Sequence, residues 1–199
     1  MKIVIATRNK GKAHEIKKKL ADLDLEILTL DDFLDISSPR EDGKSFRENA
    51  LKKARFIAEE TNIPTLADDS GLEVDALNGK PGIFSARYAG ENATDDENNK
   101  KLLKELNGVS LEKRGASYKC VIALFFPKDE EKIIVEGSCK GFIALEPKGK
   151  GGFGYDPLFF VPEYGMTMAE LPIEIKNRIS HRGKALSKLR KKLMVILEQ

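Results

Sequence analysis

The sequence predicts an α/β fold built around a mixed β-sheet, and three observations lead to that prediction. The N-terminal third alternates short apolar runs with amphipathic helical patterns, as strand-helix-strand units do. Residues 116–126 and 132–145 are rich in β-branched and aromatic side chains and flank a turn at 127–130, which predicts a long hairpin. A chain of 199 residues that is 41% hydrophobic and 33% charged has the composition of a globular protein.

The N-terminal elements follow in order from these patterns. Residues 2–6 predict a short buried strand, and the loop after it leads into a helix whose apolar residues share one face. Residues 25–30 predict a second strand. Ser45 and Glu48 have the spacing of a capping box, so we expect a helix with an apolar stripe to begin there.

The rest of the chain continues the alternation. Short strands are expected at 65–67 and 72–77, on either side of a turn at 68–71. Thr94 and Glu97 form a second capping box and predict another helix. The remaining predicted elements are the hairpin, a strand at 158–161 and a closing basic helix at 182–197.

Composition and charge exclude several classes of protein. The longest apolar stretch, Val121–Phe126, is far shorter than the ~20 residues of a membrane span, and the run at 3–6 is too short for a secretory signal. We therefore expect a cytoplasmic protein without a membrane segment. With 34 Lys and Arg against 32 Asp and Glu, the net charge of +2 gives no general attraction to nucleic acid or to a membrane.

The cysteines and histidines argue against disulfides and zinc. Cys120 and Cys139 are the only thiols, and without a C-x-x-C spacing we expect both to be reduced and buried. With only His14 and His181 in the chain, a histidine-based zinc site is not expected. The segment 176–199 carries eight basic side chains and one acid, so its ligand should be anionic.

The loop between the first strand and the first helix is a candidate phosphate site. Backbone N–H groups at a helix start and the helix dipole both attract an anion. The loop lacks the G-x-x-x-x-G-K-[ST] pattern of a Walker A motif, so this interpretation rests on position, and an ordinary charged helix start is the alternative. The candidate residues are Thr7, Arg8, Asn9, Lys10, Gly11 and Lys12.

The glycine-rich stretch 149–154 is a second candidate. It satisfies the dinucleotide pattern G-x-G-x-x-G, but a β-like run follows where that fingerprint requires a helix, so a Rossmann site is not expected. We expect a loop that approaches a ligand closely. Phe153 and Tyr155 offer rings on which a base can stack, and Asp156 offers an acceptor for a base N–H. Ordinary core rings are the alternative.

Asp68 and Asp69 are the candidates for metal chemistry. Burying two adjacent acids without partners is costly, and Mg2+, which binds through one or two carboxylates and substrate phosphates, relieves that cost. A turn in which the two acids cap local N–H groups is the alternative. Glu41, in the loop before the Ser45 capping box, supplies a second carboxylate if the fold brings it near.

The sequence Ser-His-Arg-Gly at 180–183 follows Lys176 and leads into the basic helix, so it places donors at another helix start. A hydrolase triad is not expected, because the chain has no G-x-S-x-G nucleophile elbow. Ligand recognition is the simpler role for these side chains.

Six ordered blocks span nearly the whole chain: A-T-R-N-K-G-K at 6–12, S-F-R-E-N-A at 45–50, L-A-D-D-S-G-L-E-V at 66–74, P-G-I-F-S-A-R-Y at 81–88, G-G-F-G-Y-D-P at 151–157 and S-H-R-G-K-A at 180–185. Together these blocks resemble the inosine triphosphate pyrophosphatase family, also described as dITP/XTP pyrophosphatases, which remove deaminated purine nucleotides from the precursor pool. Arg8, where many members have a small residue, and Pro172 are variations that put no functional position in doubt.

The resemblance implies a fold, an assembly and a reaction. Residues 1–199 would form a single nucleoside triphosphate pyrophosphatase domain, an elongated two-lobed α/β body around a long mixed sheet, with the active site in the cleft between the lobes. The assembly would be a homodimer. The reaction would be Mg2+-assisted attack of water on the α-phosphorus of ITP, dITP or XTP, which releases the monophosphate and pyrophosphate.

The resemblance also assigns roles position by position. Asp69 would be the catalytic base and would bind Mg2+ together with Glu41. Thr7, Asn9 and Lys12 would hold phosphates. The base pocket would consist of Phe153, Gly154, Tyr155 and Asp156, and the other substrate contacts would come from Ser70, Lys176, His181 and Arg182.

Two other functions stay open at this point. An enzyme of similar architecture for pyrimidine nucleotides, such as the Maf-like pyrophosphatases, would prefer dTTP or UTP to ITP. A nucleic-acid-binding module that uses the basic C-terminal helix would bind RNA or DNA with a steep salt dependence and release no pyrophosphate. We favour the purine enzyme, because Asp69 and Lys12 serve no purpose in a module that only binds.

Overall fold

The computed structural model describes residues 1–33, 36–37, 39 and 41–198. The strands are β1 (Lys2–Ile5), β2 (Glu26–Thr29), β3 (Thr65–Val74), β4 (Gly115–Phe126), β5 (Glu131–Ile143), β6 (Phe159–Val161) and β7 (Met166–Thr167). The α-helices are α1 (Lys10–Leu20), α2 (Phe46–Thr61), α3 (Asp95–Glu105), α4 (Ile173–Ile179) and α5 (His181–Leu197). Short 3-10 helices lie at Leu30–Asp32, Asp75–Leu77, Gly82–Arg87 and Leu111–Lys113.

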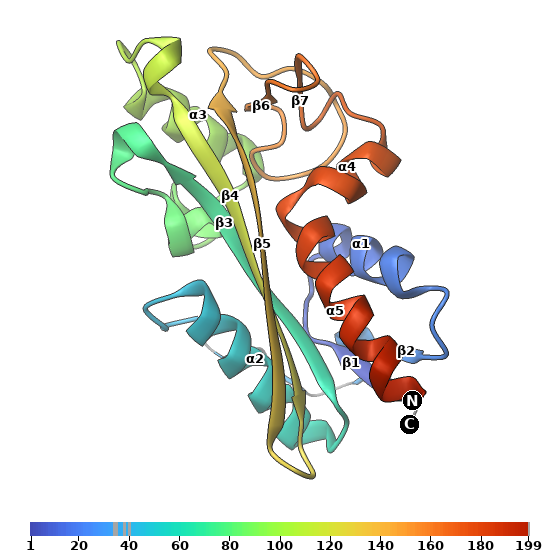
Figure 1. The fold of residues 1–199 in the computed structure, drawn as a ribbon. Coiled ribbons are helices and arrows are strands. Elements are labelled where there is room, and N and C mark those ends of the chain that lie inside the picture. Colours follow the sequence, from blue (N-terminus) through green and yellow to red (C-terminus); the bar gives the residue numbers. More distant parts are fainter. Residues whose placement is uncertain (34–35, 38, 40, 199) are drawn as a thin grey trace. The chain divides into compact units, whose positions relative to one another are not determined.

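The strands of the described residues form one sheet in the order β2-β1-β3-β4-β5-β6-β7. Strand β1 runs parallel to both β2 and β3, whereas β6 runs antiparallel to β5 and β7. The sheet is therefore mixed and is accompanied by helices, as Figure 1 shows. The predicted α/β class is confirmed.

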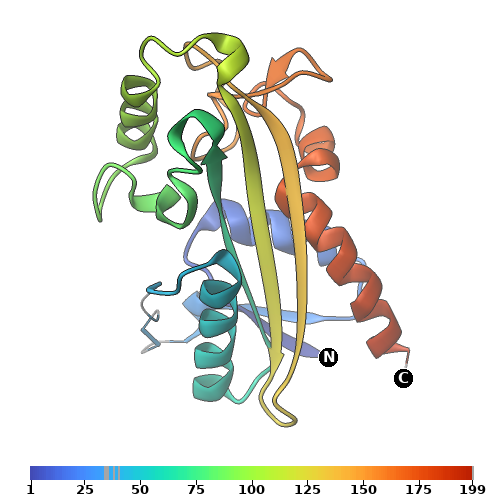
Figure 2. The ribbon, with the colours of Figure 1, turned by 60° about the vertical axis from the view of Figure 1, so that its left-hand side comes forward.

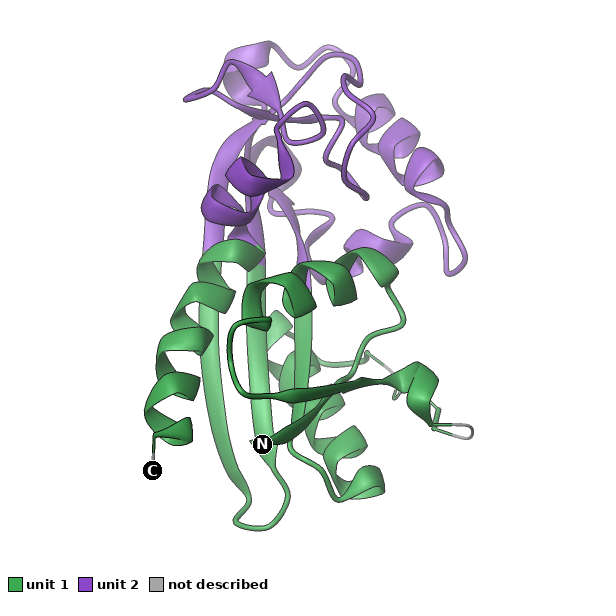
Figure 3. Cartoon of the chain, turned by 90° about the vertical axis from the view of Figure 1, so that its right-hand side faces the viewer, with its two compact units in different colours: residues 1–69, 120–137, 182–199 green, residues 70–119, 138–181 purple. Residues whose placement is uncertain are grey.

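The chain divides into two compact units, which are coloured separately in Figure 3. The unit boundaries fall inside β3, β4 and β5, so each of these strands contributes residues to both units. That residues 1–199 form a single domain stays a prediction. Unit 1 consists of Met1–Asp69, Cys120–Gly137 and Arg182–Gln199, and unit 2 consists of Ser70–Lys119 and Ser138–His181.

In unit 1, helices cover both faces of the sheet (Figures 1 and 2). On one face, Ile16 of α1 and Leu189 of α5 belong to the same core cluster as Leu66 of β3. On the other face, Ala54 of α2 belongs to a second cluster with Ala67 of β3. Because successive side chains of a strand point to opposite faces, the continuous apolar runs of β1 and β3 supply both layers.

Unit 2 has a core of its own. Leu72 of β3, Leu102 of α3 and Tyr118 of β4 are buried in one cluster with Tyr155 and Phe159. The ring centroids of Tyr118 and Phe159 lie 4.5 Å apart. Tyr155 and Phe159, which follow the glycine-rich segment 149–154, therefore anchor this part of the chain in the core of unit 2.

The largest difference from the sequence prediction concerns residues 65–77. The predicted turn at 68–71 is wrong, because β3 runs without interruption from Thr65 to Val74 and a 3-10 helix follows it. Charged residues are rare inside buried strands. Here Asp68 and Asp69 are both buried, and each has cationic partners that make its burial possible.

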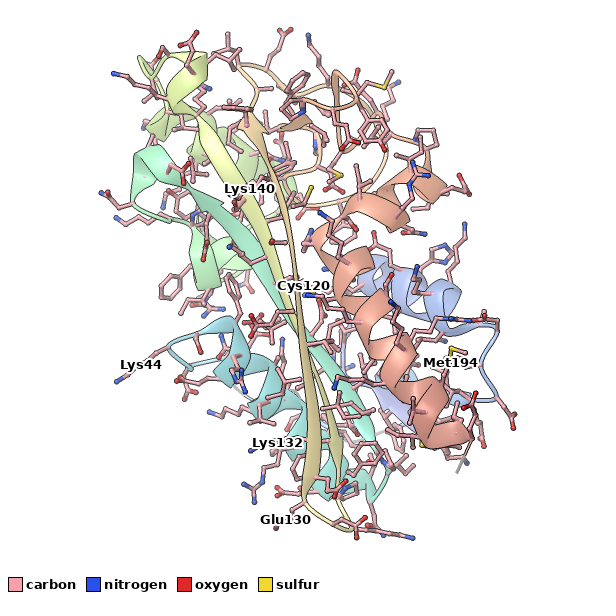
Figure 4. All side chains as sticks on the ribbon, in the orientation of Figure 1. Lys44, Cys120, Glu130, Lys132, Lys140 and Met194 are labelled. Carbon is pink, nitrogen blue, oxygen red and sulfur yellow. The ribbon has the colours of Figure 1, made fainter. Side chains whose placement is uncertain are left out.

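The hairpin and the closing helix are where they were predicted. Strands β4 and β5 flank residues 127–130, and Figure 4 shows Glu130 and Lys132 near the tip of the hairpin. Helix α5 starts one residue before the predicted position and ends at the predicted one. The short helix α4 was not predicted.

The two predicted capping boxes differ in detail. At α3, Thr94 and Glu97 form the complete reciprocal pair. At α2, the Ser45 side chain accepts a hydrogen bond from the N–H of Glu48, but the Glu48 carboxylate accepts from the N–H of Lys44 at 2.7 Å. The start of α2 is therefore capped by Ser45, and the loop before the helix is bonded to it through the N–H of Lys44.

Both cysteines are buried thiols, as predicted. Figure 4 shows Cys120 in the middle of the sheet, and burial raises the pKa of its thiol to about 12. A thiol that stays protonated at neutral pH is a poor nucleophile. None of the described helices combines the length and the apolar character that a membrane span requires.

Candidate active site

Strand β3 places the carboxylates of Asp68 and Asp69 on opposite faces of the sheet in unit 1. Side chains alternate along a strand, so Asp68 shares a face with Leu66 and Asp69 shares a face with Ala67. The first face packs against α1 and α5, and the second packs against α2. The two acids are neighbours in the sequence but have different surroundings.

Asp68 lies in a buried group of charges that we call the Asp68 network (Lys12, Glu15, Asp68 and Arg182). Its Oδ2 is 3.1 Å from Lys12 Nζ and accepts hydrogen bonds of 3.2 Å from Nε and Nη2 of Arg182. Arg182 Nη1 donates to Glu15 Oε2 at 2.7 Å. Burial disfavours the ionised acid, but Lys12 and Arg182 outweigh it and hold the pKa of Asp68 below its ordinary value.

Asp69 lies in a second group, which we call the Asp69 cluster (Glu41, Lys53 and Asp69). Lys53 Nζ is 2.8 Å from Glu41 Oε1, 3.6 Å from Asp69 Oδ1 and 2.7 Å from the carbonyl oxygen of Asp68. Burial lowers the pKa of Lys53, but Asp69 and Glu41 outweigh this effect and raise it above its ordinary value. The buried ammonium group of Lys53 therefore interacts with the carboxylates of both Glu41 and Asp69.

The carboxyl group of Asp69 has the properties of a reactive acid-base group. Burial raises its pKa, the Lys53 charge opposes the rise, and the Glu41 carboxylate adds to it, with a net increase. The Asn49 side chain lies near enough to lower the pKa of Asp69, but within the described part of the chain no hydrogen bond of ordinary geometry reaches Asp69 Oδ2, although this atom is buried. A buried carboxylate oxygen with open acceptor capacity and a raised pKa is a candidate for accepting a proton or binding a cation.

Helix α2 holds the loop that carries Glu41. The side-chain oxygen of the buried Asn49 accepts a hydrogen bond from the N–H of Gly43 at 2.8 Å. A Cβ atom on Gly43 would lie 2.6 Å from that oxygen, so the close approach requires glycine. Figure 4 shows Lys44 on the same loop, directly before α2. Two backbone N–H groups of this loop are thus bonded to side chains of α2.

The loop between β1 and α1 has the predicted geometry of a helix start. The Asn9 side chain caps α1 by accepting from the N–H of Lys12 at 3.0 Å, and Thr7 Oγ1 accepts from the N–H of Asn9 at 3.2 Å. Lys10, the first helical residue, is exposed. Arg8 donates to the carbonyl of Ile36 at 2.8 Å. Lys12 connects this loop to the Asp68 network.

Unit 2 contains a third group, which we call the Asp156 cluster (Tyr118, Phe153, Asp156, Lys176 and His181). Asp156 Oδ2 accepts from Lys176 Nζ at 2.7 Å and from the N–H of Phe153 at 3.0 Å. Lys176 Nζ lies 4.9 Å from the centroid of the Phe153 ring. The buried ammonium is therefore fixed between a carboxylate and an aromatic face.

A stacked pair of rings completes the Asp156 cluster. The rings of Tyr118 and His181 are 4.5 Å apart at an interplanar angle of 11°, and Tyr118 Oη donates to Asp156 Oδ1 at 3.4 Å. Tyr155 differs from them, since its ring is part of the core and its hydroxyl donates to the carbonyl of Ser85 at 2.7 Å. Tyr155 is therefore an ordinary core residue, whereas the side chain of Phe153 is partly exposed.

The predicted site residues thus fall into separate groups. Within unit 1, the Asp69 cluster joins the two predicted metal ligands, and the Asp68 network joins Lys12 to Arg182. Within unit 2, the Asp156 cluster contains four of the predicted substrate-binding residues. Ser70 and Gly154 belong to the same unit outside that cluster.

Four residues of these groups were missed by the sequence analysis: Glu15, Asn49, Lys53 and Tyr118. Three of them carry a signal in the helical pattern, because Glu15 lies on the buried face of α1, and Asn49 and Lys53 lie on the buried face of α2. A charged or amide group on an apolar stripe needs a buried partner. Tyr118 carries no such signal, since an aromatic residue in a strand is ordinary.

The Asp69 cluster suits a divalent cation. Mg2+ usually binds through one or two carboxylates, and phosphate oxygens and waters complete its shell. The described residues contain no group of three or more His, Cys, Asp or Glu side chains that could hold a metal. Glu41 and Asp69 supply two hard oxygen donors, and Asp69 Oδ2 has open acceptor capacity. These residues therefore fit an ion that is bound jointly by the protein and by a phosphate ligand.

Comparison with known proteins shows the family. The model of the Ham1 family matches residues 3–192. This chain belongs to the Ham1 family. The matched range contains all the residues of the Asp68 network, the Asp69 cluster and the Asp156 cluster.

Relatives and solved structures agree with this assignment. A protein named dITP/XTP pyrophosphatase from Geobacter sulfurreducens is 56% identical over 189 residues, which is 95% of this chain and 94% of the relative. A protein of the same name from Haemophilus influenzae is 52% identical and covers 96% of this chain and 98% of its own length. The solved structure of a HAM1 protein from Coxiella burnetii has a TM-score of 0.90 at 46% identity, with 98% of each chain covered. The family resemblance that the six motifs indicated is confirmed.

Proposed function

We propose that this Ham1 protein hydrolyses deaminated purine nucleoside triphosphates, such as dITP, ITP and XTP, to the monophosphate and pyrophosphate. The observation that carries the proposal is the Asp69 cluster, in which a buried carboxylate with open acceptor capacity lies beside a fixed ammonium and a second carboxylate. This arrangement suits the activation of water next to phosphate oxygens. The names of relatives that are more than 50% identical support the substrate class.

In this proposal Asp69 is the general base. Lys53 lies 3.6 Å from Oδ1, and Oδ2 has no hydrogen bond within the described residues, so one oxygen is oriented while the other can take a proton from water. The raised pKa increases the proton affinity of Asp69 at neutral pH, which favours this role. The water oxygen bonds to the α-phosphorus, the bond to the bridging oxygen breaks, and pyrophosphate leaves with the electron pair.

Several side chains of unit 1 would hold the phosphates and Mg2+. Glu41 and Asp69 would bind the ion, which when bound would withdraw charge from the phosphate oxygens. Lys12 provides a positive charge for the leaving pyrophosphate. The other residues proposed to bind phosphates lie on the capped loop before α1 and are Thr7, Arg8, Asn9, Lys10 and Gly11.

We propose that the Asp156 cluster recognises the base. Hypoxanthine and xanthine present a 6-keto acceptor and an N1–H donor, whereas adenine presents an amino donor and a bare N1. Lys176 and His181 are donors for the keto oxygen, Asp156 is an acceptor for N1–H, and Phe153 offers a stacking face. ATP would leave polar groups unpaired on both sides, and sites of this kind reject such analogues by about 10⁴-fold.

Arg182 has a different part in this proposal from the one that the resemblance implied. Its side chain is 2% exposed, and its guanidinium group is bonded to Glu15 and Asp68. We propose that Arg182 acts through Asp68, by maintaining the charge network that includes Lys12. It would affect all nucleotides alike, because it does not read the base.

Product analysis tests the proposed reaction. Incubation of dITP with the protein and Mg2+ is expected to give dIMP and pyrophosphate in equal amounts. In water labelled with oxygen-18, the label should enter dIMP and not pyrophosphate, because the attack is at the α-phosphorus. Formation of dIDP and orthophosphate, or label in pyrophosphate, would contradict the proposed site of attack.

Other expectations from the sequence concern competing functions, assembly and location. Membership of the Ham1 family and the names of the relatives disfavour both the pyrimidine enzyme and the nucleic-acid-binding module. The homodimer and the cytoplasmic location stay predictions that rest on the resemblance and on composition. Size measurement in solution would test the first of these.

The proposed metal site predicts a specific effect of Glu41→Gln. Glutamine keeps the size of the side chain but loses the charge, so the Mg2+ concentration for half-maximal turnover is expected to rise about 10-fold or more. A Mg2+ titration of pyrophosphate release measures this, and chelation of the metal should abolish turnover. Asp42→Asn is the matched control, because Asp42 is adjacent, exposed and paired with Lys52. An unchanged Mg2+ requirement in Glu41→Gln would remove Glu41 from the metal site.

A further inference from the structure

The peptide groups of Gly154 are held on both sides by side chains of α3. The N–H of Gly154 donates to Asp95 Oδ2 at 2.6 Å, and its carbonyl accepts from Asn99 Nδ2 at 2.9 Å. Asp95 and Asn99 are one helical turn apart, so they lie on the same side of α3. These contacts join segments 59 and 55 residues apart in the sequence, so they do not result from local chain geometry.

Gly154 connects two residues of the Asp156 cluster. Phe153 precedes it, and Asp156 Oδ2 accepts a hydrogen bond from the N–H of Phe153 at 3.0 Å. Gly154 has a φ of +63°, in the left-handed region that favours glycine. The backbone torsions of Gly154 therefore contribute to the position of Phe153 relative to the Asp156 carboxylate.

The α3 helix is anchored without the two contacts to Gly154. Asn98 is buried and makes hydrogen bonds of 2.7 and 3.2 Å to the backbone of the preceding segment. Thr94 caps the first turn. The contacts of Asp95 and Asn99 therefore restrain the glycine-rich loop more than they stabilise the helix.

Besides the α3 side chains, a local turn restrains Gly154, since the N–H of Asp156 donates to the carbonyl of Phe153 at 3.3 Å. The next residue, Tyr155, is fixed in the core through its ring and through its hydroxyl on Ser85. A Cβ atom built on Gly154 would meet no atom within 4 Å, so packing does not confine that side of the residue. The side chains of α3 therefore bond the N–H and the carbonyl of Gly154, and the local turn bonds the carbonyl of Phe153 before it.

We propose that Asp95 and Asn99 are positioning residues for base selectivity, because they fix the Gly154 peptides and thereby the Phe153 ring against Asp156 and Lys176. This inference rests on the proposed function, in which the Asp156 cluster recognises the base. Neither Asp95 nor Asn99 contacts the base in this account. When one restraint is lost, the Phe153 ring samples other orientations and binding of the base weakens, while the groups proposed for the chemistry keep their partners.

Four variants separate positioning from simple stability. Asn99→Asp keeps the size of the side chain and removes the donor to the Gly154 carbonyl. Asp95→Ala removes the acceptor, and Asp95→Asn restores an acceptor oxygen as the conservative rescue. Asp96→Asn is the matched control, since Asp96 is the next residue of α3, is exposed and pairs with Lys100. The readouts are the Kd for IMP by calorimetry, kcat and KM for ITP and ATP, and Tm.

Asn99→Asp and Asp95→Ala are expected to weaken IMP binding about 3- to 10-fold, the range that follows from losing one hydrogen bond. KM for ITP should rise by a similar factor and kcat at saturating ITP should stay within about twofold of the parent, because binding of the base is lost and the chemical step is not. The ratio of kcat/KM for ITP to that for ATP should therefore fall. Asp95→Asn and Asp96→Asn should match the parent in all readouts.

Unchanged IMP affinity in both Asn99→Asp and Asp95→Ala would overturn the inference. An equal loss of kcat for ITP and ATP at the parent's IMP affinity, or a lowered Tm as the only change, would show a structural role and would also overturn it. The binding measurement separates this inference from the proposed function. A parent protein that binds IMP but releases no pyrophosphate contradicts the proposed function alone, and a parent that binds no IMP contradicts both.

Discussion

Replacing Asp69 by asparagine is expected to reduce pyrophosphate release from dITP about 10³-fold while the protein stays folded. The amide keeps the shape of the side chain but can neither take a proton from water nor contribute charge to a metal. Because the native carboxyl group is buried and its pKa is raised, its loss should not destabilise the fold strongly. Steady-state kinetics with pyrophosphate detection and a thermal melt measure both parts.

Asp129→Asn serves as the control for this variant, because Asp129 lies exposed in the turn of the hairpin. Nucleotide affinity should survive in part in Asp69→Asn, since Lys12 and the Asp156 cluster are untouched. Turnover within about tenfold of the parent would exclude Asp69 as the base, since general bases contribute more than that.

The neighbouring substitution, Asp68→Asn, should instead act mainly on stability. It removes one carboxylate partner of the buried Arg182 guanidinium, and the loss of one member of a buried charge pair costs about 3 to 5 kcal/mol. For a chain of this length the midpoint of thermal unfolding should fall by roughly 10 °C. Thermal and urea melts of Asp68→Asn and Asp69→Asn side by side measure the difference.

The difference in stability between the parent and Asp68→Asn should depend on pH in a defined direction. The pKa of Asp68 is lowered in the folded protein, so its carboxylate stabilises the fold above the pKa of the unfolded chain, about 3.9. The stability gap between the parent and Asp68→Asn should therefore be constant near neutral pH and shrink only as the pH falls below about 4. Equal stability of the two proteins at pH 7 would contradict the structural role of Asp68.

Much of the fold could be predicted because its elements have strong local signals. The hairpin, the capped helix at Thr94 and the basic helix α5 follow from periodicity, turn residues and capping. β3 could not be predicted as one strand, because two acids, a serine and a glycine in succession are typical of a turn. Its continuity depends on Lys12, Lys53 and other cations from distant segments, and periodicity contains no information about them.

The candidate site could be predicted only in part, because its motifs are local but its charge pairs join distant segments. The motif around Asp68 and Asp69 marks a functional region, but residues alone do not say which carboxylate has its pKa lowered by surrounding cations and which has its pKa raised. The alternation of side chains along β3 separates them once the faces are known. Lys53 escaped attention because a lysine in a helix is usually a solvated residue, and only its place on the buried face of α2 distinguishes it.

The clearest test of the proposed function compares dITP with dATP, which differ only in the groups at positions 1 and 6 of the base. With Mg2+ and direct detection of pyrophosphate, kcat/KM for dITP is expected to exceed that for dATP by about 10⁴-fold, because dATP leaves buried polar groups unpaired. XTP and ITP should behave like dITP. Equal kcat/KM for dITP and dATP, or a preference for dTTP or UTP, would contradict the account.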